Sequence, residues 1–194
     1  RQEEFERRLE KLQSYWSSPL CEGERSLNIS PIQKPMPPVF IATTTADRAY
    51  QAGKEGHSVL TIVSPAAEDL TTVQKVMDAH AQGLSKAEAP HAEAEVVVTV
   101  LAHAAEIEEA AMSTAGVSLG RFLKAMSGND VPDPDGLCKA MVARRTGLFG
   151  TAEQIGESLN QFRDLGVEHV SLLANFGGMS SEQVAKSIRL LADA

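Results

Sequence analysis

Long apolar runs, paired cysteines and basic patches are all scarce in this sequence of 194 residues. Its apolar runs fall far short of the ~18 residues of a membrane-spanning helix, so we predict no membrane segment. With 18 basic against 26 acidic residues the net charge is −8, which argues against nucleic acid or an anionic membrane as a partner. Cys21 and Cys138 match no metal-binding spacing. Residues 1–20 are charged and amphipathic rather than signal-like, so we expect reduced thiols in a cytoplasmic protein.

Strand-like and helix-like segments alternate from residue 39 onward. Short, nearly continuous apolar runs occupy 39–42, 58–63, 95–102 and 168–174, and a helical pattern follows each one. This alternation predicts an α/β fold with a parallel sheet, in which these four strands are neighbours in that order. Four such units are half of a parallel (β/α)8 TIM barrel. An open doubly wound sheet is the alternative, although no glycine-rich fingerprint follows any strand.

Helix boundaries are predicted from apolar spacing, caps and breakers. Residues 2–17 form an amphipathic helix, and Ser26–Ile32 is either an outlying strand or part of the connector. Ser64–Pro65 is expected to open a helix that ends near Gly83. The remaining expectations are a helix over 104–126, in one piece or two, a loop over 127–136, a short helix over 137–145, a capping box at Thr151 and Gln154, and a last helix capped by Ser180 or Ser181.

Three threonines follow the first strand, and their position has two interpretations. Thr43, Thr44 and Thr45 stand between the strand and a helix that begins at Ala46. Hydroxyl donors, backbone N–H groups and the positive end of a helix dipole together form an anion site, most naturally for a phosphate. The alternative is that Thr44 or Thr45 only caps the helix, since threonine is a common N-cap.

Four stretches in a fixed order resemble the C-terminal half of a bacterial luciferase-like flavin-dependent monooxygenase. They are the charged helix that ends near Trp16 with the connector 31–38, the run 39–45 with Gly53 and Gly56 behind it, residues 146–154, and residues 166–170 with 175–178. Each stretch alone is weak, but together they span nearly the whole chain. The resemblance implies that 1–194 is a single domain with strands five to eight of a TIM barrel. It also implies that residues 113–145 form the insertion region that shields the active site.

The same resemblance implies an oxidoreductase. Family members bind reduced FMN, or a deazaflavin in one branch, and use O2 to oxidise a small organic substrate through a flavin peroxide. A flavin reductase is then an expected partner, and the loop Ala42–Thr45 is expected to hold the flavin phosphate. The family's strands one to four are absent from the sequence, and Arg1 lies inside a helical pattern. We therefore expect a homo-oligomer or a pairing with the missing N-terminal half, and not a well-behaved monomer.

Candidate site residues follow from this comparison. His103, at the end of the third strand, is the candidate catalytic residue, or else a structural histidine. The candidate cofactor-binding residues are Ala42, Thr43, Thr44, Thr45, Arg48, Asn175, Phe176 and Gly177. Arg48 could instead form a surface ion pair, Phe176 could pack under the last helix, and Gly177 could simply make a tight turn. His57 and His169 are expected to be structural, and His80 and His91 exposed.

Two functions are compatible with these residues. The first is the flavin-dependent monooxygenase, in which the cofactor carries the chemistry and no metal is needed. The second is a catalytically silent flavin-binding protein or a partner subunit of an active chain. Residues 127–137 are rich in Gly, Asn, Asp and Pro and are expected to be mobile without ligand. The substrate and the choice between FMN and deazaflavin are not encoded in this half.

Overall fold

The computed structural model describes the chain except residues 1, 18–30, 35 and 89–93. It divides into two compact units, Arg1–Val39 and Phe40–Ala194. In the first unit α1 (Gln2–Ser17) is the expected amphipathic helix, and its apolar Phe5 and Leu12 are about two-fifths exposed. Residues 26–30 of the strand considered at 26–32 lie outside the described residues, as does His91. None of the described helices is long and apolar enough to cross a membrane.

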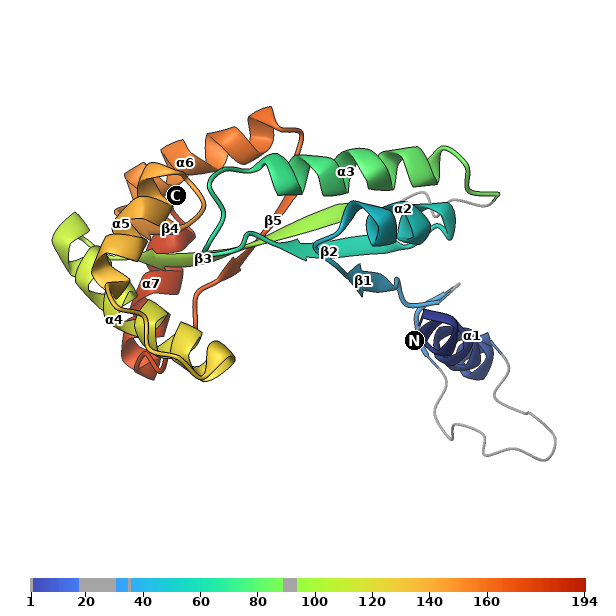
Figure 1. Cartoon of the computed structure of the whole chain (residues 1–194), viewed down its shortest axis with the longest axis horizontal. Helices are drawn as coiled ribbons and strands as arrows, with labels where there is room; N and C mark the ends of the chain where they lie inside the picture. The colour runs from blue at the N-terminus through green and yellow to red at the C-terminus, as the bar shows by residue number, and fades with distance from the viewer. Residues whose placement is uncertain (1, 18–30, 35, 89–93) are drawn as a thin grey trace. The chain divides into compact units, whose positions relative to one another are not determined.

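The second unit alternates strands and helices (Figure 1). Its elements are β1 (Phe40–Ala42), α2 (Ala46–Lys54), β2 (Ser58–Ile62), α3 (Thr71–Leu84), β3 (Val96–Ala104), α4 (Glu108–Ser127), α5 (Pro134–Ala143), β4 (Leu148–Gly150), α6 (Ala152–Asp164), β5 (His169–Leu173) and α7 (Ser181–Leu191).

Every strand pair in the described sheet is parallel, as predicted. β1 pairs with β2, β2 with β3, and β3 with β5, which is the predicted order. The sequence did not predict β4, which pairs with the last three residues of β3. It is only three residues long, so it carries no alternation that could be recognised. β3 has nine residues, of which Val97–Leu101 pair with β5 and Ala102–Ala104 pair with β4.

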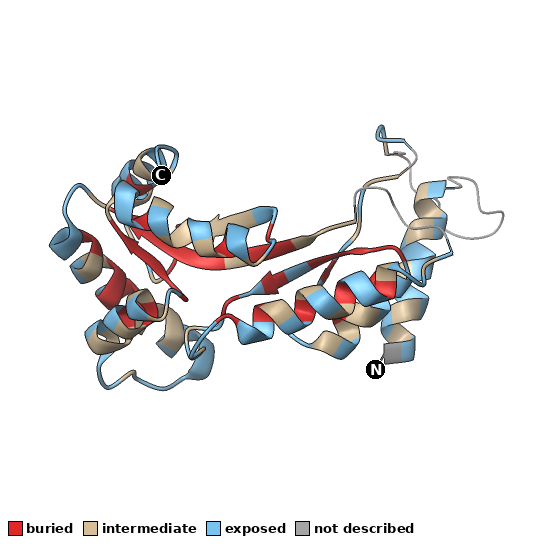
Figure 2. Ribbon diagram, turned by 90° about the horizontal axis from the view of Figure 1, so that it is seen from above, coloured by how far each residue is buried: buried red, intermediate tan, exposed pale blue. Residues whose placement is uncertain are grey.

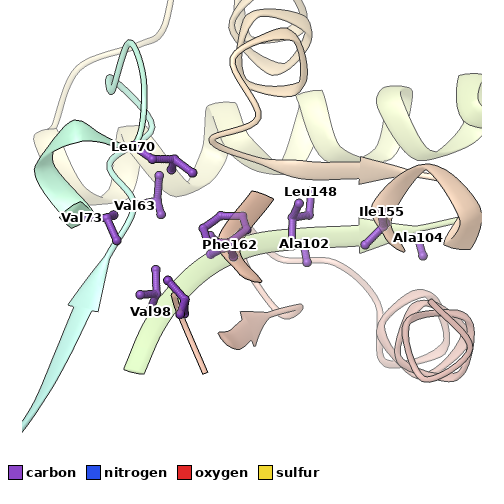
Figure 3. Close-up of a cluster of buried hydrophobic side chains, with 11 residues drawn as sticks. Val63, Leu70, Val73, Val98, Ala102, Ala104, Leu148, Ile155 and Phe162 are labelled. Atoms are coloured by element: carbon purple, nitrogen blue, oxygen red, sulfur yellow. The ribbon is translucent and has the colours of Figure 1, made fainter. Parts of the chain in front are cut away.

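One face of the sheet packs against helices and forms the main core. On this helix face Val98, Val100, Ala102 and Ala104 of β3 are at most 2% exposed. They meet apolar residues of α3, α6 and the β2–α3 connection, and Figure 3 shows Phe162 lying against this row. The consecutive valines of β3 are thus explained, because alternate residues are buried on opposite faces of the strand. Figure 2 shows the buried residues running along β3 and the inner sides of the helices.

The opposite face, here called the open face, carries Phe40, Leu60, Ile62, Thr99 and His103. The strand register places these side chains on one side of the sheet. Toward β4 this face is covered by a second cluster, which combines Leu101 with residues of α4 and α5. Over β1 and β2, however, Phe40, Leu60 and Ile62 are 41%, 38% and 37% exposed.

Several helix boundaries differ from the sequence expectation. The helix after β2 begins at Thr71, not at Ser64–Pro65, because Asp69 Oδ1 accepts a hydrogen bond from Thr71 N–H (2.8 Å) and initiates the turn there. The loop expected over 127–136 ends at Asp133, because Asp133 caps α5 by accepting a hydrogen bond from Gly136 N–H (2.8 Å). α4 is one continuous helix. The capping box at Thr151 is confirmed, and Ser180 is the cap of α7.

Two glycines let α2 and α3 pack with their backbones in contact. A Cβ on Gly53 would collide with the carbonyl oxygen of His80, and one on Gly83 with the carbonyl oxygen of Tyr50. Each glycine thus fits against the backbone of the neighbouring helix. This contact fixes α2, whose N-terminus follows the threonine turn.

His80 is buried, which corrects the expectation that it is exposed. It is 3% exposed, and its Nε2 lies 2.8 Å from the carbonyl oxygen of His57. This contact joins α3 to the start of β2 across 23 residues, so neither local pattern indicates it. His169 is exposed, and its Nδ1 lies 3.3 Å from Glu95 Oε2 at the start of the sheet.

Candidate functional site

The threonine turn is tied to β2 and arranged around Thr43. The backbone N–H of Thr43 donates to the Leu60 carbonyl oxygen (3.0 Å), which extends the β1–β2 pairing. Thr43 Oγ1 accepts from the N–H of Thr45 (3.1 Å) and lies 3.2 Å from Thr45 Oγ1. Thr45 occupies the N-cap position of α2 in an extended conformation, but its side chain makes no capping hydrogen bond. Thr45 is therefore the N-cap residue, as the capping interpretation predicts, but its side chain does not form the capping hydrogen bond.

A cleft of about 470 Å³ lies beside this turn. Its walls are Ala42, Thr43, Thr44, Leu60, Thr61, Ile62 and Thr99, which belong to β1, β2, β3 and the threonine turn. One end carries hydroxyls next to the positive N-terminus of the nine-residue α2, and the rest is largely aliphatic. Asp47 and Arg48 bring one negative and one positive charge to the first turn of α2. The cleft combines a polar end with an apolar wall.

His103 lies near the C-terminal end of β3, opposite Phe149 of β4. It is 4% exposed, and its Nδ1 has no hydrogen-bond partner among the described residues. Burial lowers its pKa from the ordinary value of 6.5, so the neutral ring is favoured. It lies four positions after Thr99, which lines the cleft, and therefore about 13 Å from it along the strand. A ligand that contacts both must therefore be elongated.

Asn175, Phe176 and Gly177 follow β5, and Phe176 and Gly177 contact α4 rather than the cleft. Phe176 is 3% exposed, and its ring lies 6.2 Å from that of Phe122 and 6.0 Å from that of Phe149. It therefore packs between α4 and β4, not under the last helix. Gly177 has a φ of 63°, and a Cβ there would collide with the carbonyl oxygen of Ser118. Close packing on α4 already accounts for this glycine.

A larger cavity, of about 800 Å³, was not indicated by the sequence. It lies between the β2–α3 connection and the C-terminal end of α4, and it shares Thr44 and Ile62 with the cleft. Phe122, Leu123 and Met126 contribute most of the wall on the α4 side. Phe122, Leu123 and Met126 continue the apolar stripe of α4 beyond Leu119. This spacing in the sequence could have indicated that the C-terminal part of α4 presents an apolar surface.

The structure thus brings together part of the predicted site. Ala42, Thr43 and Thr44 line the cleft, while Thr45 and Arg48 stand at the start of the adjoining helix. His103 and residues 175–177 do not line it. In the described ranges no group of three or more His, Cys, Asp or Glu side chains could hold a metal ion. Cys138 is buried, and burial raises the pKa of its thiol to about 12, so it is not a nucleophile.

The sequence profile of luciferase-like monooxygenases matches residues 12–169. The chain belongs to this family. A comparison with curated proteins found no match. Family membership agrees with the parallel sheet.

Solved structures show the same fold. The chain is similar to the monooxygenase RslO1 from Streptomyces bottropensis, with a TM-score of 0.78 at 23% identity over 95% of this chain and 57% of that chain. It is also similar to the oxygenating constituent of 3,6-diketocamphane monooxygenase from Pseudomonas putida in complex with FMN, with a TM-score of 0.62 at 14% identity over 91% and 52%. A third is the coenzyme F420-dependent tetrahydromethanopterin reductase from Methanopyrus kandleri, with a TM-score of 0.59 at 12% identity over 94% and 60%. The chain therefore spans little more than half the length of these TIM-barrel proteins.

The residues of this luciferase-like chain fit a flavin mononucleotide in two respects. Among the described residues, the side chain of Thr45 makes no capping hydrogen bond to α2 that would compete with a phosphate. The aliphatic side chains of Leu60 and Ile62 offer exposed apolar surface to a ring system. Outside the cleft, the buried Nδ1 of His103 has no hydrogen-bond partner within the described part of the chain. Buried polar atoms are normally hydrogen-bonded, so this nitrogen is available to a ligand.

Proposed function

We propose that this chain is the cofactor-binding part of a flavin-dependent monooxygenase that uses reduced FMN and O2 to oxidise a small organic substrate. The observation that carries the proposal is the threonine turn at a helix N-terminus, beside an apolar cleft, in a chain of the luciferase-like family. Reduced flavin supplies the two electrons with which one oxygen atom of O2 enters the substrate and the other leaves as water. A deazaflavin is the alternative cofactor.

In this proposal the protein's own residues bind the cofactor, position it and shield it from water. Thr44 and Thr45 donate hydroxyl hydrogen bonds to the phosphate, and Thr43 keeps the turn in shape by accepting from Thr45 N–H (3.1 Å). Arg48 adds a positive charge one turn into α2. Leu60 and Ile62 cover the apolar part of the cofactor and exclude water. Phe176 belongs to the second cluster, where it supports Phe122, and Asn175 and Gly177 flank it in the chain.

His103 is proposed to hold a proton near the reacting atoms. Its neutral ring, favoured by burial, has one nitrogen that accepts and one that donates. Since Nδ1 has no partner in the described structure, a bound ligand is its natural hydrogen-bond partner. Because Thr99 of the cleft and His103 lie about 13 Å apart along β3, this role requires a ligand that reaches from one to the other.

The test compares the double variant Thr44→Ala, Thr45→Ala with wild type by flavin fluorescence titration. A hydrogen bond to a charged group contributes roughly 1.5–3 kcal/mol, so loss of one should weaken FMN binding by about tenfold to a hundredfold. Riboflavin lacks the phosphate and should bind the variant almost as well as wild type. Equal losses for FMN and riboflavin would refute the phosphate role.

Thr151→Ala is the matched control. Thr151 is also an N-cap threonine, but its hydroxyl accepts from Gln154 N–H and completes a capping box. Its loss should cost about 1 kcal/mol of stability and leave FMN affinity unchanged. The Thr44/Thr45 variant should show the reverse, because the Thr45 side chain makes no capping bond.

A catalytically silent flavin-binding protein or partner subunit is the second candidate. The observation that favours it is the exposed apolar part of the open face at Phe40, Leu60 and Ile62, which a partner chain would cover. The chain is also similar to flavoprotein 390, with a TM-score of 0.56 at 10% identity over 92% of this chain and 73% of that chain. Rapid reoxidation of bound reduced FMN without product formation, across a panel of neutral and anionic substrates, would favour the silent protein.

A further inference from the structure

One side-chain hydrogen bond joins the start of α4 to the start of α6. Gln154 Nε2 donates to Glu108 Oε2 at 2.7 Å, across 46 positions of the chain. The other end of the same amide belongs to the capping box of α6, because its Oε1 accepts from Thr151 N–H (2.9 Å). A Cβ on Gly150 would lie 2.5 Å from that oxygen, so the glycine leaves room for the amide. Gln154 is therefore both a local cap and a link to another helix.

The first turn of α4 has no side-chain cap of its own. Ile107 occupies the N-cap position, and its side chain forms no capping hydrogen bond. Glu108 is the first residue of the helix, and a carboxylate that accepts from an amide forms a short, charge-assisted bond. The bond to Gln154 thus holds a helix end that the local sequence leaves without a cap.

This helix end lies beside the part of the sheet that carries His103. His103 shares its face of β3 with Leu101, and α4 and α5 cover that face. Phe149, the residue opposite His103 on β4, lines a cavity of about 180 Å³ together with Glu108 and Gln154. The link between the two helices therefore closes a hollow next to the cross-strand neighbour of His103.

The strand end that carries His103 is held independently of this link. Ala104 N–H donates to Ser187 Oγ of α7 (2.9 Å). Ala105 N–H donates to the Gly150 carbonyl oxygen (3.1 Å), which continues the pairing of β3 with β4. Loss of the link should therefore leave the end of β3 in place and release the start of α4.

The pKa of His103 measures how well its ring is shielded from water. Burial lowers this pKa, and among the described residues no neighbouring charge contributes to the lowering. The two cavities beside the start of α4 are nevertheless lined by charged side chains, namely Glu108, Glu109, Asp135, Glu157, Lys139 and Arg145. A test must therefore separate the bond of Gln154 from a change of charge.

We propose that Gln154 is a positioning residue for His103. By holding Glu108 it keeps the first turn of α4 closed beside the ring and keeps water from Nδ1, so that a ligand becomes the hydrogen-bond partner of this nitrogen. The inference rests on the proposed function, in which His103 holds a proton near the reacting atoms. Gln154 acts through His103 and touches no reacting atom itself.

The test measures the reaction of His103 with diethyl pyrocarbonate, peptide by peptide, in the full-length protein without flavin. Gln154→Glu retains the capping box, in which either residue serves, but places two carboxylates together. His103 should then react about three- to tenfold faster, and its pKa from NMR titration should rise toward 6.5. His169, whose side chain is 54% exposed, is the internal standard for the reagent.

Exchanging the two partners separates the bond from the charge. The double variant Gln154→Glu, Glu108→Gln reverses donor and acceptor and restores the net charge of the pair. It should return the reaction rate and the pKa of His103 to the wild-type values. A double variant in which His103 reacts as fast as in Gln154→Glu would overturn the proposal.

Gln183→Glu is the matched control. Gln183 completes the same capping box in α7 by accepting from Ser180 N–H (2.9 Å), but within the described chain it has no hydrogen bond to another helix. This variant should leave His103 as in wild type, and equal effects of the two single variants would refute the positioning role. If Gln154→Glu unfolds, Gln154→Met and Gln183→Met repeat the comparison without an added charge, and only the former should speed the reaction.

Flavin titration of the same samples separates this inference from the proposed function. The expected changes at His103 in a protein that binds no FMN would refute the cofactor assignment and leave the link from Gln154 to His103 standing. FMN binding to wild type, with His103 unchanged in Gln154→Glu, would refute the positioning role and leave the cofactor assignment standing.

Discussion

Substituting Gly83 by alanine should destabilise the second unit, because a Cβ there has no space. It would collide with the carbonyl oxygen of Tyr50 and would lie 2.8 Å from the backbone nitrogen of Lys54. Both obstacles belong to the backbone of α2, which cannot rotate away as a side chain would. The helices must therefore separate, and this disturbs the contact that buries Ala49, Ala52 and Val76 completely or nearly so.

The expected size follows from two opposing effects. Overpacking a close helix contact costs about 3 kcal/mol, near the upper end of the usual range because the obstacle is rigid. Alanine recovers up to about 1 kcal/mol relative to glycine in a helix. The net loss is about 2 kcal/mol, which should lower the urea midpoint by about 1 M at an m-value near 2 kcal/mol/M. Circular dichroism during urea titration is the assay.

Gly156→Ala is the control. Gly156 lies inside α6, and a Cβ there would meet only the terminal residue Ala194, at 3.2 Å. A contact at 3.2 Å needs a shift of only a few tenths of an ångström, so this variant should be neutral or up to about 1 kcal/mol more stable. Gly53→Ala should behave like Gly83→Ala, and the double variant should lose less than the sum, because one separation relieves both collisions. A Gly83→Ala protein as stable as wild type would refute the proposed backbone contact.

Three further predictions concern His103, the α4–α5 connection and the open face. Burial lowers the pKa of His103 from 6.5, so its contribution to stability is present above pH 6.5 and is lost as the pH falls through the lower pKa of the folded state. The urea midpoint of wild type should therefore fall over this pH range, and that of His103→Gln should fall less. Amides of residues 128–131 should exchange hydrogen much faster than those of β3 when no ligand is bound, and equal protection would contradict the expected mobility. Since Phe40, Leu60 and Ile62 are more than one-third exposed, the chain alone should associate in sedimentation velocity, whereas a stable cooperative monomer would show that this surface tolerates water.

The sheet could be predicted because each strand carries its own evidence. The apolar runs at Phe40–Ala42, Ser58–Ile62 and Val96–Ala104 are buried on at least one face, and helices between them require parallel connections. Capping boxes are equally local, since Thr151 and Ser180 bond to residues three positions away. The cofactor was predicted from the family resemblance alone, because the spacing of apolar residues carries no information about a ligand.

The errors came from interactions that are remote in sequence or from competition between two local signals. His80 is buried because its ring reaches the His57 carbonyl, a partner 23 residues away. At the start of α3 two signals competed: Ser64–Pro65 resembles a helix start, but Asp69 forms the bond that begins the helix. The apolar cavity has walls from Thr44 to Val131, so its existence depends on how α4 packs and could not be read from any one segment.

The two parts of the cleft explain why a mononucleotide suits it better than a simple anion or a hydrocarbon. A phosphate ion alone would use the threonine hydroxyls and leave Leu60 and Ile62 exposed to water. A hydrocarbon alone would cover those side chains but would form no hydrogen bond with the threonine hydroxyls at the other end of the cleft. A ligand with a phosphate at one end and a flat apolar ring system at the other satisfies both requirements.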